Sequence, residues 1–322
     1  MGEMLNVVVD ALWRQGENNL AVSLVHENGE PLPAWQPGAH IDVHLPCGII
    51  RQYSLTGTHA QTDSYVICVA KERASRGGSR YVHDTLRPGQ RLSISAPRNL
   101  FPLHAARHVV LMAAGIGITP LYAMAKQLEA TGNAFELHYY VKQRKSAAFL
   151  RELSQAFSHG RCEIHCSGEG KSARTTLPDA LDAPGTDRRL YACGPQGFMQ
   201  AVHKAASAKG WPDDRIHTEA FQPPAQPVQA DDSGSFIVTL ASSGEQWPVP
   251  ADKTIAQVLQ ENGVAVSLSC EMGMCGACLT PVKDGVVDHR DTVQSDVEKS
   301  ATPQYVALCC SRSHSANLVI DL

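Results

Sequence analysis

The sequence predicts a multidomain β and α/β protein: an antiparallel β-barrel, then a parallel α/β domain, then a small mixed-sheet domain. Roughly the first hundred residues hold short alternating apolar runs separated by proline-glycine turns. From residue 107, continuous apolar strands alternate with glycine-led helices, and a cysteine-rich loop interrupts short strands near the C-terminus. We place the barrel at residues 1–103, the α/β domain at 104–222, a proline-rich linker at 223–234 and the last domain at 235–322.

The composition is that of an ordinary soluble protein, because 43% of the residues are hydrophobic and 19% are charged. The net charge is −4 and the chain has no block of Lys and Arg, so it offers no basic patch for nucleic acid. Met1–Asn6 lacks the basic and apolar regions of a secretory signal, and the longest apolar run, Val109–Leu121, is too short to span a bilayer. We therefore expect a cytoplasmic protein with no membrane and no nucleic-acid partner.

The barrel prediction rests on strands with a period of two. Apolar and polar residues alternate from Ala39 to Leu45, a pattern that buries one face of a strand. Proline-glycine turns at residues 36–38 and 87–89 separate such runs, as in a small closed barrel. We expect the histidines of this region to be solvated on the outer face rather than to bind metal: His40, His44 and His59.

Two stretches of the barrel region suit a ligand that carries a phosphate and a flat ring. The run Arg51–Ser54 places a cation, an aromatic ring and a hydroxyl on one strand. Gly77 and Gly78 expose backbone N–H groups just before a predicted helix start at Ser79, and helix N-termini bind phosphate. The glycine pair alone would indicate only a turn, but arginines at positions 51, 76 and 80 favour the phosphate site.

Two glycine motifs predict nucleotide binding in the α/β domain. The apolar strand at 108–114 runs into Gly115-Ile-Gly117, after which we expect Thr119 to cap a helix and Pro120 to be its first residue. A second motif begins at Cys193, at the end of another strand. The first motif is a weak signal because it lacks a third glycine. However, ligands of parallel sheets bind at the carboxyl ends of the strands, where both motifs fall.

A cysteine-rich loop predicts an iron–sulfur cluster. Cys270, Cys275 and Cys278 have the C-x₄-C-x₂-C spacing of plant-type [2Fe–2S] sites, and Cys309 and Cys310 follow about thirty residues later. Two glycines inside the loop let its backbone curl close to the sulfurs. Zinc is the alternative, but zinc sites usually combine short cysteine pairs, and only one C-x₂-C pair occurs here. A disulfide framework is typical of small secreted domains, which this chain is not.

The order of these domains and motifs resembles the phthalate dioxygenase reductase family, and the resemblance covers the whole chain. The Arg51–Ser54 strand and the glycine pair resemble the flavin-binding barrel of the ferredoxin-reductase superfamily. The two nucleotide motifs resemble the pyridine-nucleotide domain of that superfamily, and the last domain resembles a β-grasp, plant-type ferredoxin. Residues 38–45, 95–102 and 288–291 most resemble the branch of the family that serves vanillate O-demethylase.

The resemblance implies a role for each motif. Tyr53 and Ser54 would contact the isoalloxazine of FMN, and the glycine pair with Ser79 would hold its single phosphate. The nucleotide motifs would hold the pyrophosphate and nicotinamide of NADH, with Cys193 near the nicotinamide and Phe221 near the flavin. The implied cofactor-binding residues are Arg51, Gln52, Tyr53, Ser54, Gly77, Gly78, Ser79, Gly115, Gly117, Thr119, Pro120, Cys193, Gly194, Pro195 and Phe221. The implied cluster ligands are Cys270, Cys275, Cys278 and Cys309, the last because residues 309–312 match the family's cysteine-x-Ser-Arg segment.

The resemblance also implies a function, the reductase component of a two-component Rieske-type aromatic oxygenase or demethylase. Electrons would pass from NADH through FMN and the [2Fe–2S] cluster to a separate Rieske-type oxygenase. The flavin is needed because a hydride carries two electrons and the cluster accepts one. Two alternatives remain open: a stand-alone NADH reductase for a diffusible acceptor such as a quinone or cytochrome, and a non-enzymatic module with zinc at the cysteines and a nucleotide-sensing α/β domain.

Overall fold

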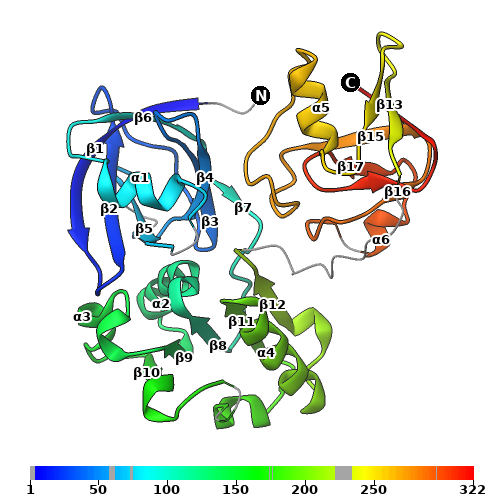
Figure 1. Cartoon of the computed structure of the whole chain (residues 1–322). Helices are drawn as coiled ribbons and strands as arrows, with labels where there is room; N and C mark the ends of the chain where they lie inside the picture. Colours follow the sequence, from blue (N-terminus) through cyan, green and yellow to red (C-terminus); the bar gives the residue numbers. More distant parts are fainter. Residues whose placement is uncertain are drawn as a thin grey trace. The chain divides into compact units, whose positions relative to one another are not determined.

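In a computed structural model, the described residues form two compact units, residues 4–221 and 234–322 (Figure 1). The structure describes residues 4–57, 62–72, 75–173, 175, 177–221, 234–294 and 296–322. His59 and residues 223–233 of the predicted linker lie outside these ranges.

The first part of the larger unit is a closed antiparallel barrel. Its sheet has the strand order β4-β3-β6-β1-β2-β5, with β7 paired to β3. Leu55, just after β4, pairs with Ile67 of β5, so the two ends of this sheet meet. The predicted antiparallel barrel is confirmed. Its elements are β1 (Met4–Arg14), β2 (Asn19–His26), β3 (Ala39–His44), β4 (Ile50–Ser54), β5 (Tyr65–Ala70), α1 (Gly78–Asp84), β6 (Arg91–Ser95) and β7 (Arg98–Asn99).

The expectation of solvated histidines on β3 is wrong for His40. This side chain is 4% exposed, and burial, together with the nearby Arg98 charge, lowers the pKa of His40 to about 4. β7 pairs antiparallel with the start of β3 and places Arg98 opposite His40. Arg98 of β7 donates to both carboxylate oxygens of Asp42, at 2.8 and 2.7 Å. Alternation along one strand could not show that β7 pairs with β3 at this point.

The second part of the larger unit is a parallel sheet with the strand order β10-β9-β8-β11-β12, which confirms the predicted α/β architecture. Helices α2 and α3 pack on one face, and α4 packs on the other. The strands are β8 (His108–Ala114), β9 (Ala134–Val141), β10 (Gly160–Cys166), β11 (Arg188–Cys193) and β12 (Ile216–Glu219). The helices are α2 (Ile118–Thr131), α3 (Leu150–Leu153) and α4 (Gln196–Ala208), with 3₁₀ turns η1 (Gly115–Gly117), η2 (Arg144–Ser146), η3 (Ser167–Glu169), η4 (Asp179–Asp182) and η5 (Asp213–Arg215).

Helix α2 has the apolar face that its sequence predicts. Leu121, Met124, Ala125 and Leu128 are buried against the sheet, while Ala123 joins the core of the barrel. The barrel hairpin β1–β2 also bonds to the α/β part: the Gln15 side chain accepts from the backbone N–H of residue 149 at 3.0 Å. These contacts lie within one compact unit, which therefore holds both the stretches expected to bind flavin and the motifs expected to bind nucleotide.

The smaller unit is a β-grasp domain with a mixed sheet of order β14-β13-β19-β15-β17 and a separate β16-β18 pair. Thr254 and Gln257 begin α5 with a capping box, in which each side chain accepts from the other residue's backbone N–H. Its elements are β13 (Phe236–Leu240), β14 (Gln246–Val249), α5 (Ile255–Glu261), β15 (Leu279–Asp284), β16 (Val287–Asp288), α6 (Asp296–Lys299), β17 (Tyr305–Ala307), β18 (Arg312–Ser313) and β19 (Asn317–Ile320).

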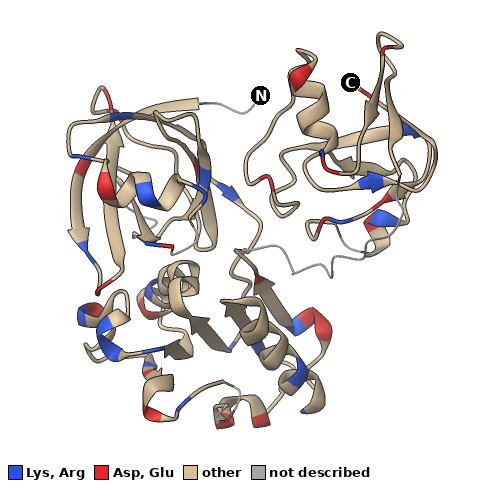
Figure 2. Ribbon diagram, viewed as in Figure 1, with Lys and Arg blue, Asp and Glu red and all other residues tan. Residues whose placement is uncertain are grey.

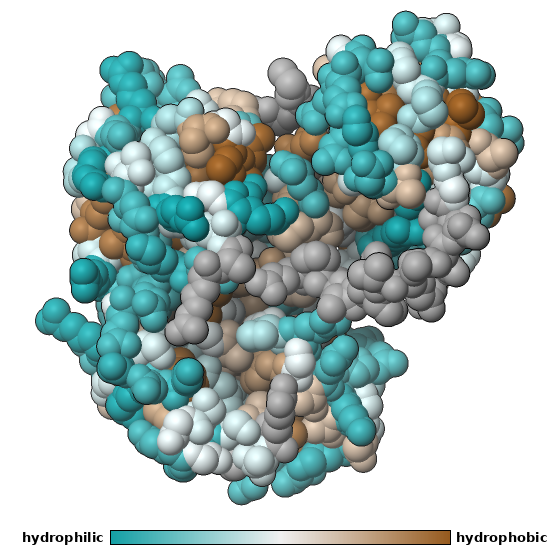
Figure 3. Space-filling view, in the orientation of Figure 1, coloured by the Kyte–Doolittle hydropathy of each residue, from teal (hydrophilic) through white to brown (hydrophobic). Residues whose placement is uncertain are grey.

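The surface carries both signs of charge. Figure 2 shows acidic and basic residues interspersed along both units, in keeping with the small net charge. Figure 3 shows one face that is mostly hydrophilic, with small hydrophobic patches. Within the described ranges, every helix is too short or too polar to cross a lipid bilayer.

Candidate functional site

The two predicted phosphate-binding stretches of the barrel lie against each other. A Cβ atom on Gly78 would lie 2.6 Å from Cγ of Arg51, so only glycine fits beside that side chain. Gly77 has φ +93°, a conformation that favours glycine. The guanidinium of Arg51 donates to the carbonyl of Arg76 at 3.0 Å. The strand and the glycine pair therefore form one cradle, with a cation on one side and backbone N–H groups on the other.

Residues 51–54 alternate between two faces of β4. Arg51 and Tyr53 are paired with the core residues Val43 and Ile41 of β3, and Tyr53 packs against the barrel core. Burial raises the pKa of the Tyr53 hydroxyl.

The other face of β4 carries Gln52 and Ser54. Gln52 donates to the Asp42 carboxylate at 3.0 Å, and Ser54 is buried at the end of the strand. A cation and an aromatic ring on one face, with an amide and a hydroxyl on the other, suit a ligand that has both a phosphate and a polar flat ring.

Ser79 lies one residue inside α1, which begins at Gly78 rather than at Ser79 as predicted. Its hydroxyl donates to the Ser75 hydroxyl at 3.0 Å and accepts from the backbone N–H of Glu72 at 3.2 Å. Ser75 in turn accepts from the N–H of Gly77 at 3.2 Å. These bonds hold the glycine pair in position beside Arg51.

The two glycine motifs of the α/β part meet at the carboxyl ends of β8 and β11. A Cβ atom on Gly117 would lie 2.2 Å from the carbonyl oxygen of Cys193, and one on Gly194 would lie 2.8 Å from Cβ of Ala114. Gly115 has φ +56° and open space around it. This is the strand edge at which ligands of parallel sheets bind.

The predicted cap of α2 is wrong by two residues. The helix begins at Ile118, with Gly117 as its N-cap and no side-chain cap. Thr119 and Pro120 are buried in the first turn, and the Thr119 hydroxyl donates to the carbonyl of Ile116 at 3.0 Å. The physical reason is that the 3₁₀ turn over residues 115–117 continues directly into the helix. Pro195 is the N-cap of α4.

Cys193 and Glu219 face each other across the parallel pair β11–β12. Cys193 is fully buried, which raises the pKa of its thiol well above the usual range. Burial also raises the pKa of the Glu219 carboxyl to about 8, and one of its buried oxygens has no hydrogen-bond partner among the residues that the structure describes. Sequence reasoning missed Glu219, although an acidic residue two positions before Phe221 at a strand end was a signal. Phe221 itself is half-buried and packs against the core.

The four candidate cluster cysteines gather in the β-grasp unit as two hydrogen-bonded thiol pairs. Cys270 is paired with Cys275, and Cys278 with Cys309. All four are buried, at 2, 9, 5 and 6% exposure. The thiol pairing and burial raise the pKa of Cys270 and Cys278, whereas accepting the hydrogen bond of Cys270 lowers the pKa of Cys275 to about 6.

The loop backbone also points donors at these sulfurs. The Cys270 sulfur accepts from the N–H groups of Met272 and Met274, at 3.3 and 3.4 Å. The Cys275 sulfur accepts from the N–H of Ala277 at 3.5 Å. Donors of this kind stabilise anionic thiolates and tune the potential of an iron–sulfur cluster. The residues present therefore fit a cluster with thiolate ligands.

Cys309 and Cys310 differ in their surroundings. Cys309 is buried and its thiol is hydrogen-bonded to that of Cys278. Cys310 is more exposed and has Ser311 Oγ 3.9 Å from its sulfur. A Cβ atom on Gly273 would lie 2.5 Å from the Cys310 sulfur. The geometry therefore favours Cys309 as the fourth candidate ligand.

Comparison with known proteins finds matches over the whole chain. Residues 238–314 match the family model "2Fe-2S iron-sulfur cluster binding domain", and residues 95–216 match "Dimethylamine monooxygenase subunit DmmA-like, N-terminal domain". The vanillate O-demethylase oxidoreductase of Pseudomonas sp. strain HR199 is 42% identical over 320 residues, which cover 99% of this chain and 100% of the relative. Tetrachlorobenzoquinone reductase of Sphingobium chlorophenolicum is 41% identical over 322 residues, 99% of this chain and 98% of the relative.

A solved structure is also similar over its full length. Phthalate dioxygenase reductase, described as a modular structure for electron transfer from pyridine nucleotides to [2Fe–2S], is 34% identical and has a TM-score of 0.75. The match covers 99% of this chain and 98% of that chain.

Proposed function

Because this chain belongs to the phthalate dioxygenase reductase family, we propose that it is the NADH-dependent reductase component of a two-component Rieske-type aromatic oxygenase or demethylase. It is a flavin iron–sulfur oxidoreductase that binds flavin, NAD(H) and a [2Fe–2S] cluster. A bound flavin supplies the conversion from two-electron to one-electron transfer that the cluster needs. We also propose that the flavin is FMN and that the electron acceptor is a Rieske-type oxygenase.

The barrel residues are assigned to the flavin. Arg51 and the backbone N–H of Gly78 would hold one phosphate, as in FMN, with Gly77 turning the loop toward it, and Tyr53 and Ser54 would contact the ring. Gln52 and Ser79 support this site through their bonds to Asp42 and Ser75.

The α/β residues are assigned to NADH. Gly115 has open space around it that would take a phosphate, and Gly117 and Gly194 let the two loops meet at the carboxyl ends of β8 and β11, at the start of α2. Thr119, Pro120, Cys193 and Pro195 shape the two loops, and Phe221 follows the neighbouring strand. These residues position the cofactors, which is the contribution that hydride and electron transfer need from a protein.

The observation that carries this proposal is the set of four buried cysteines with backbone donors at their sulfurs. We assign Cys270, Cys275, Cys278 and Cys309 as ligands of the [2Fe–2S] cluster. The non-enzymatic alternative with zinc gains no support, because the chain aligns from end to end with oxidoreductases.

The test is an anaerobic titration of the purified protein with NADH, followed by absorbance and electron paramagnetic resonance. We expect flavin bleaching together with the signal of a reduced [2Fe–2S] cluster. Flavin bleaching without a cluster signal would overturn the proposed electron path. Addition of a vanillate-type oxygenase and its aromatic substrate should then give demethylation that depends on this chain.

A second candidate function is reduction of a diffusible quinone. It is favoured by the relative named tetrachlorobenzoquinone reductase, which is nearly as similar as the vanillate relative. Steady-state rates with a halogenated benzoquinone and with the oxygenase would separate the two. A high rate with the quinone and none with any Rieske-type oxygenase would make this candidate the better one.

A further inference from the structure

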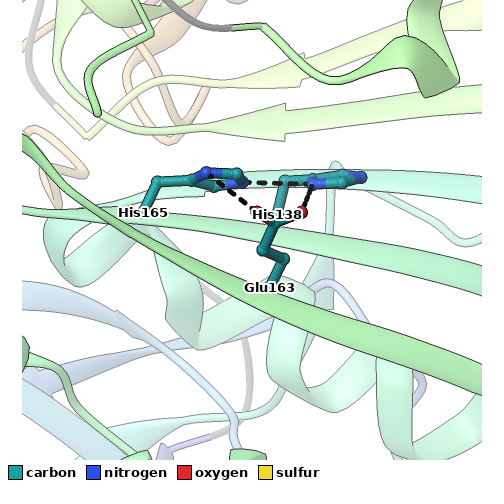
Figure 4. A group of neighbouring side chains, drawn as sticks. All are labelled: His138, Glu163 and His165. Atoms are coloured by element: carbon teal, nitrogen blue, oxygen red, sulfur yellow. Dashed lines mark hydrogen bonds and ion pairs between the residues drawn. The ribbon is translucent and has the colours of Figure 1, made fainter. Parts of the chain in front are cut away.

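A buried pair of histidines lies on the face of the parallel sheet that α4 covers, apart from the residues assigned above. His138 is on β9, and Glu163 and His165 are on β10 (Figure 4). In the parallel register, Glu163 is opposite His138, and His165 is opposite Tyr140. The two histidines are 2 and 3% exposed, whereas the Glu163 side chain is 55% exposed. The cluster is therefore closed on the protein side and open to solvent through Glu163.

The distances within this cluster suit shared ligation of one ion. His138 Nδ1 lies 3.2 Å from His165 Nε2 and 3.9 Å from a Glu163 carboxylate oxygen. One ligand atom from each of the three residues lies within 4.8 Å of the others. Zinc bonds of about 2.0–2.2 Å place two tetrahedral ligands about 3.3–3.6 Å apart. The two inner nitrogens are already at nearly this separation.

The outer nitrogens of the two rings each face a carboxylate. His138 Nε2 is 3.6 Å from Glu136, and His165 Nδ1 is 3.6 Å from Glu163. Both nitrogens are buried and have no hydrogen-bond partner in the described part of the chain. Glu136 is itself anchored by ion pairs with Arg161 and Arg188.

Two neutral imidazoles cannot donate an N–H at all three of these contacts, the inner one and the two to carboxylates. A neutral ring has one N–H and one lone pair, so the pair brings two N–H groups. Donation at the inner contact and toward the two carboxylates would take three N–H groups. One lone pair would therefore face a carboxylate, which is unfavourable at a buried site. One more positive charge between these groups, either a third proton or a cation, would remove this mismatch.

Both rings are buried, and a third proton there would lose its hydration without a hydrogen-bonded partner at either outer nitrogen in the described part of the chain. Neutral imidazoles are the form that binds metals.

We propose that His138, His165 and Glu163 bind a divalent metal ion of the zinc class. An ion on the two inner nitrogens leaves both outer N–H groups free to point at Glu136 and Glu163, so no lone pair faces a carboxylate. Two imidazoles and one carboxylate are a ligand set that zinc uses, with water in the remaining position. Glu136 would act as the carboxylate that orients a ligating histidine. The ion would join β10, the edge strand of the sheet, to β9.

The test uses the protein with its flavin and cluster bound, so that the candidate cluster cysteines are occupied. After dialysis against zinc and then against zinc-free buffer, zinc is measured by elemental analysis and its ligands by X-ray absorption at the zinc edge. We expect one retained zinc per chain with nitrogen and oxygen ligands only, and a higher melting temperature with zinc present. Sulfur ligands, or no retained zinc, would overturn the proposal. If no zinc is retained, the added positive charge between the two histidines is a third proton.

Variants make the test specific. Glu163→Gln changes a half-exposed side chain and should fold normally, and His165→Asn removes a buried ligand. Both should weaken zinc binding by at least about tenfold. His203→Asn, an exposed histidine on α4, is the matched control and should bind zinc as the wild type does. Equal zinc affinity in Glu163→Gln, His165→Asn and the control would overturn the site.

Discussion

Gly117 and Cys193 are in backbone contact: a Cβ atom on Gly117 would lie 2.2 Å from the carbonyl oxygen of Cys193. These residues are far apart in the sequence, but β8 and β11 are neighbours in the sheet and end side by side. The contact joins the two loops that we assign to NADH into one surface. Any side chain at position 117 must push one loop away from the other.

Gly117→Ala should therefore weaken NADH binding and destabilise the protein. The added methyl meets a backbone atom, which cannot move aside as a flexible side chain would, so we expect a loss of about 1–3 kcal/mol in the free energy of unfolding. Stopped-flow flavin reduction at several NADH concentrations and chemical denaturation measure the two effects. Gly185→Ala is the control, because its Cβ would meet only the Arg188 side chain at 3.4 Å. Unchanged NADH kinetics in Gly117→Ala would refute the assignment of this loop.

Arg51→Ala should weaken flavin retention. The guanidinium lies beside the glycine pair, and a hydrogen bond to a charged group contributes about 1.5–3 kcal/mol, so the flavin should bind roughly tenfold to a hundredfold more weakly. Flavin occupancy after gel filtration and titration of the flavin-free protein measure this. Arg91→Ala is the matched control, since Arg91 is an exposed barrel arginine paired with Glu27 at 3.5 Å. Full occupancy and unchanged affinity in Arg51→Ala would rule out its phosphate contact.

Much of this fold could be predicted because its signals are local. The apolar run at 108–114 coincides with β8, and the capping box of α5 depends only on Thr254 and Gln257, three residues apart. The cysteine spacing and the glycine motifs also depend only on neighbours in the chain.

What sequence reasoning missed depends on contacts between distant segments. His40 is buried, and Arg98 is opposite it only because β7 pairs with β3. Glu219 matters because parallel pairing places it opposite Cys193, and His138 meets His165 only through the register of β9 and β10. Alternation and spacing cannot show which strands pair or in what register.

Cys275→Ser should abolish reduction of cytochrome c through the cluster and leave flavin reduction by NADH intact. The two activities separate because the cysteines belong to the smaller unit and the flavin and NADH residues belong to the larger one. Iron content, cytochrome c reduction and stopped-flow flavin reduction are measured on the same preparation. Cys47→Ser, at an exposed cysteine, serves as the control. Loss of flavin reduction in Cys275→Ser would contradict the separation of these sites.

Cys309→Ser and Cys310→Ser form a matched pair that tests the fourth ligand. Cys309 is buried and its thiol is hydrogen-bonded to that of Cys278, so its replacement should remove the cluster and its paramagnetic signal. Cys310→Ser should keep the iron content and only shift the reduction potential, because this thiol lies beside Gly273 in the cluster loop. The opposite pattern would transfer the assignment to Cys310.

Glu219 should make the folded protein less stable as the pH rises. Its pKa is raised from 4.5 to about 8 by burial, so between these values the folded state holds a proton that the unfolded state releases. This contribution to stability is complete below the unfolded pKa, and the free energy of unfolding falls by at most about 1.4 kcal/mol per pH unit above it. Glu219→Gln keeps the neutral form at every pH and should flatten this slope, measured by urea denaturation from about pH 5 to pH 8.5. Glu169→Gln, at an exposed glutamate, should keep the wild-type slope. If Glu219→Gln also keeps that slope, the carboxyl is ionised in the folded protein and the buried strand end carries a charge beside Cys193.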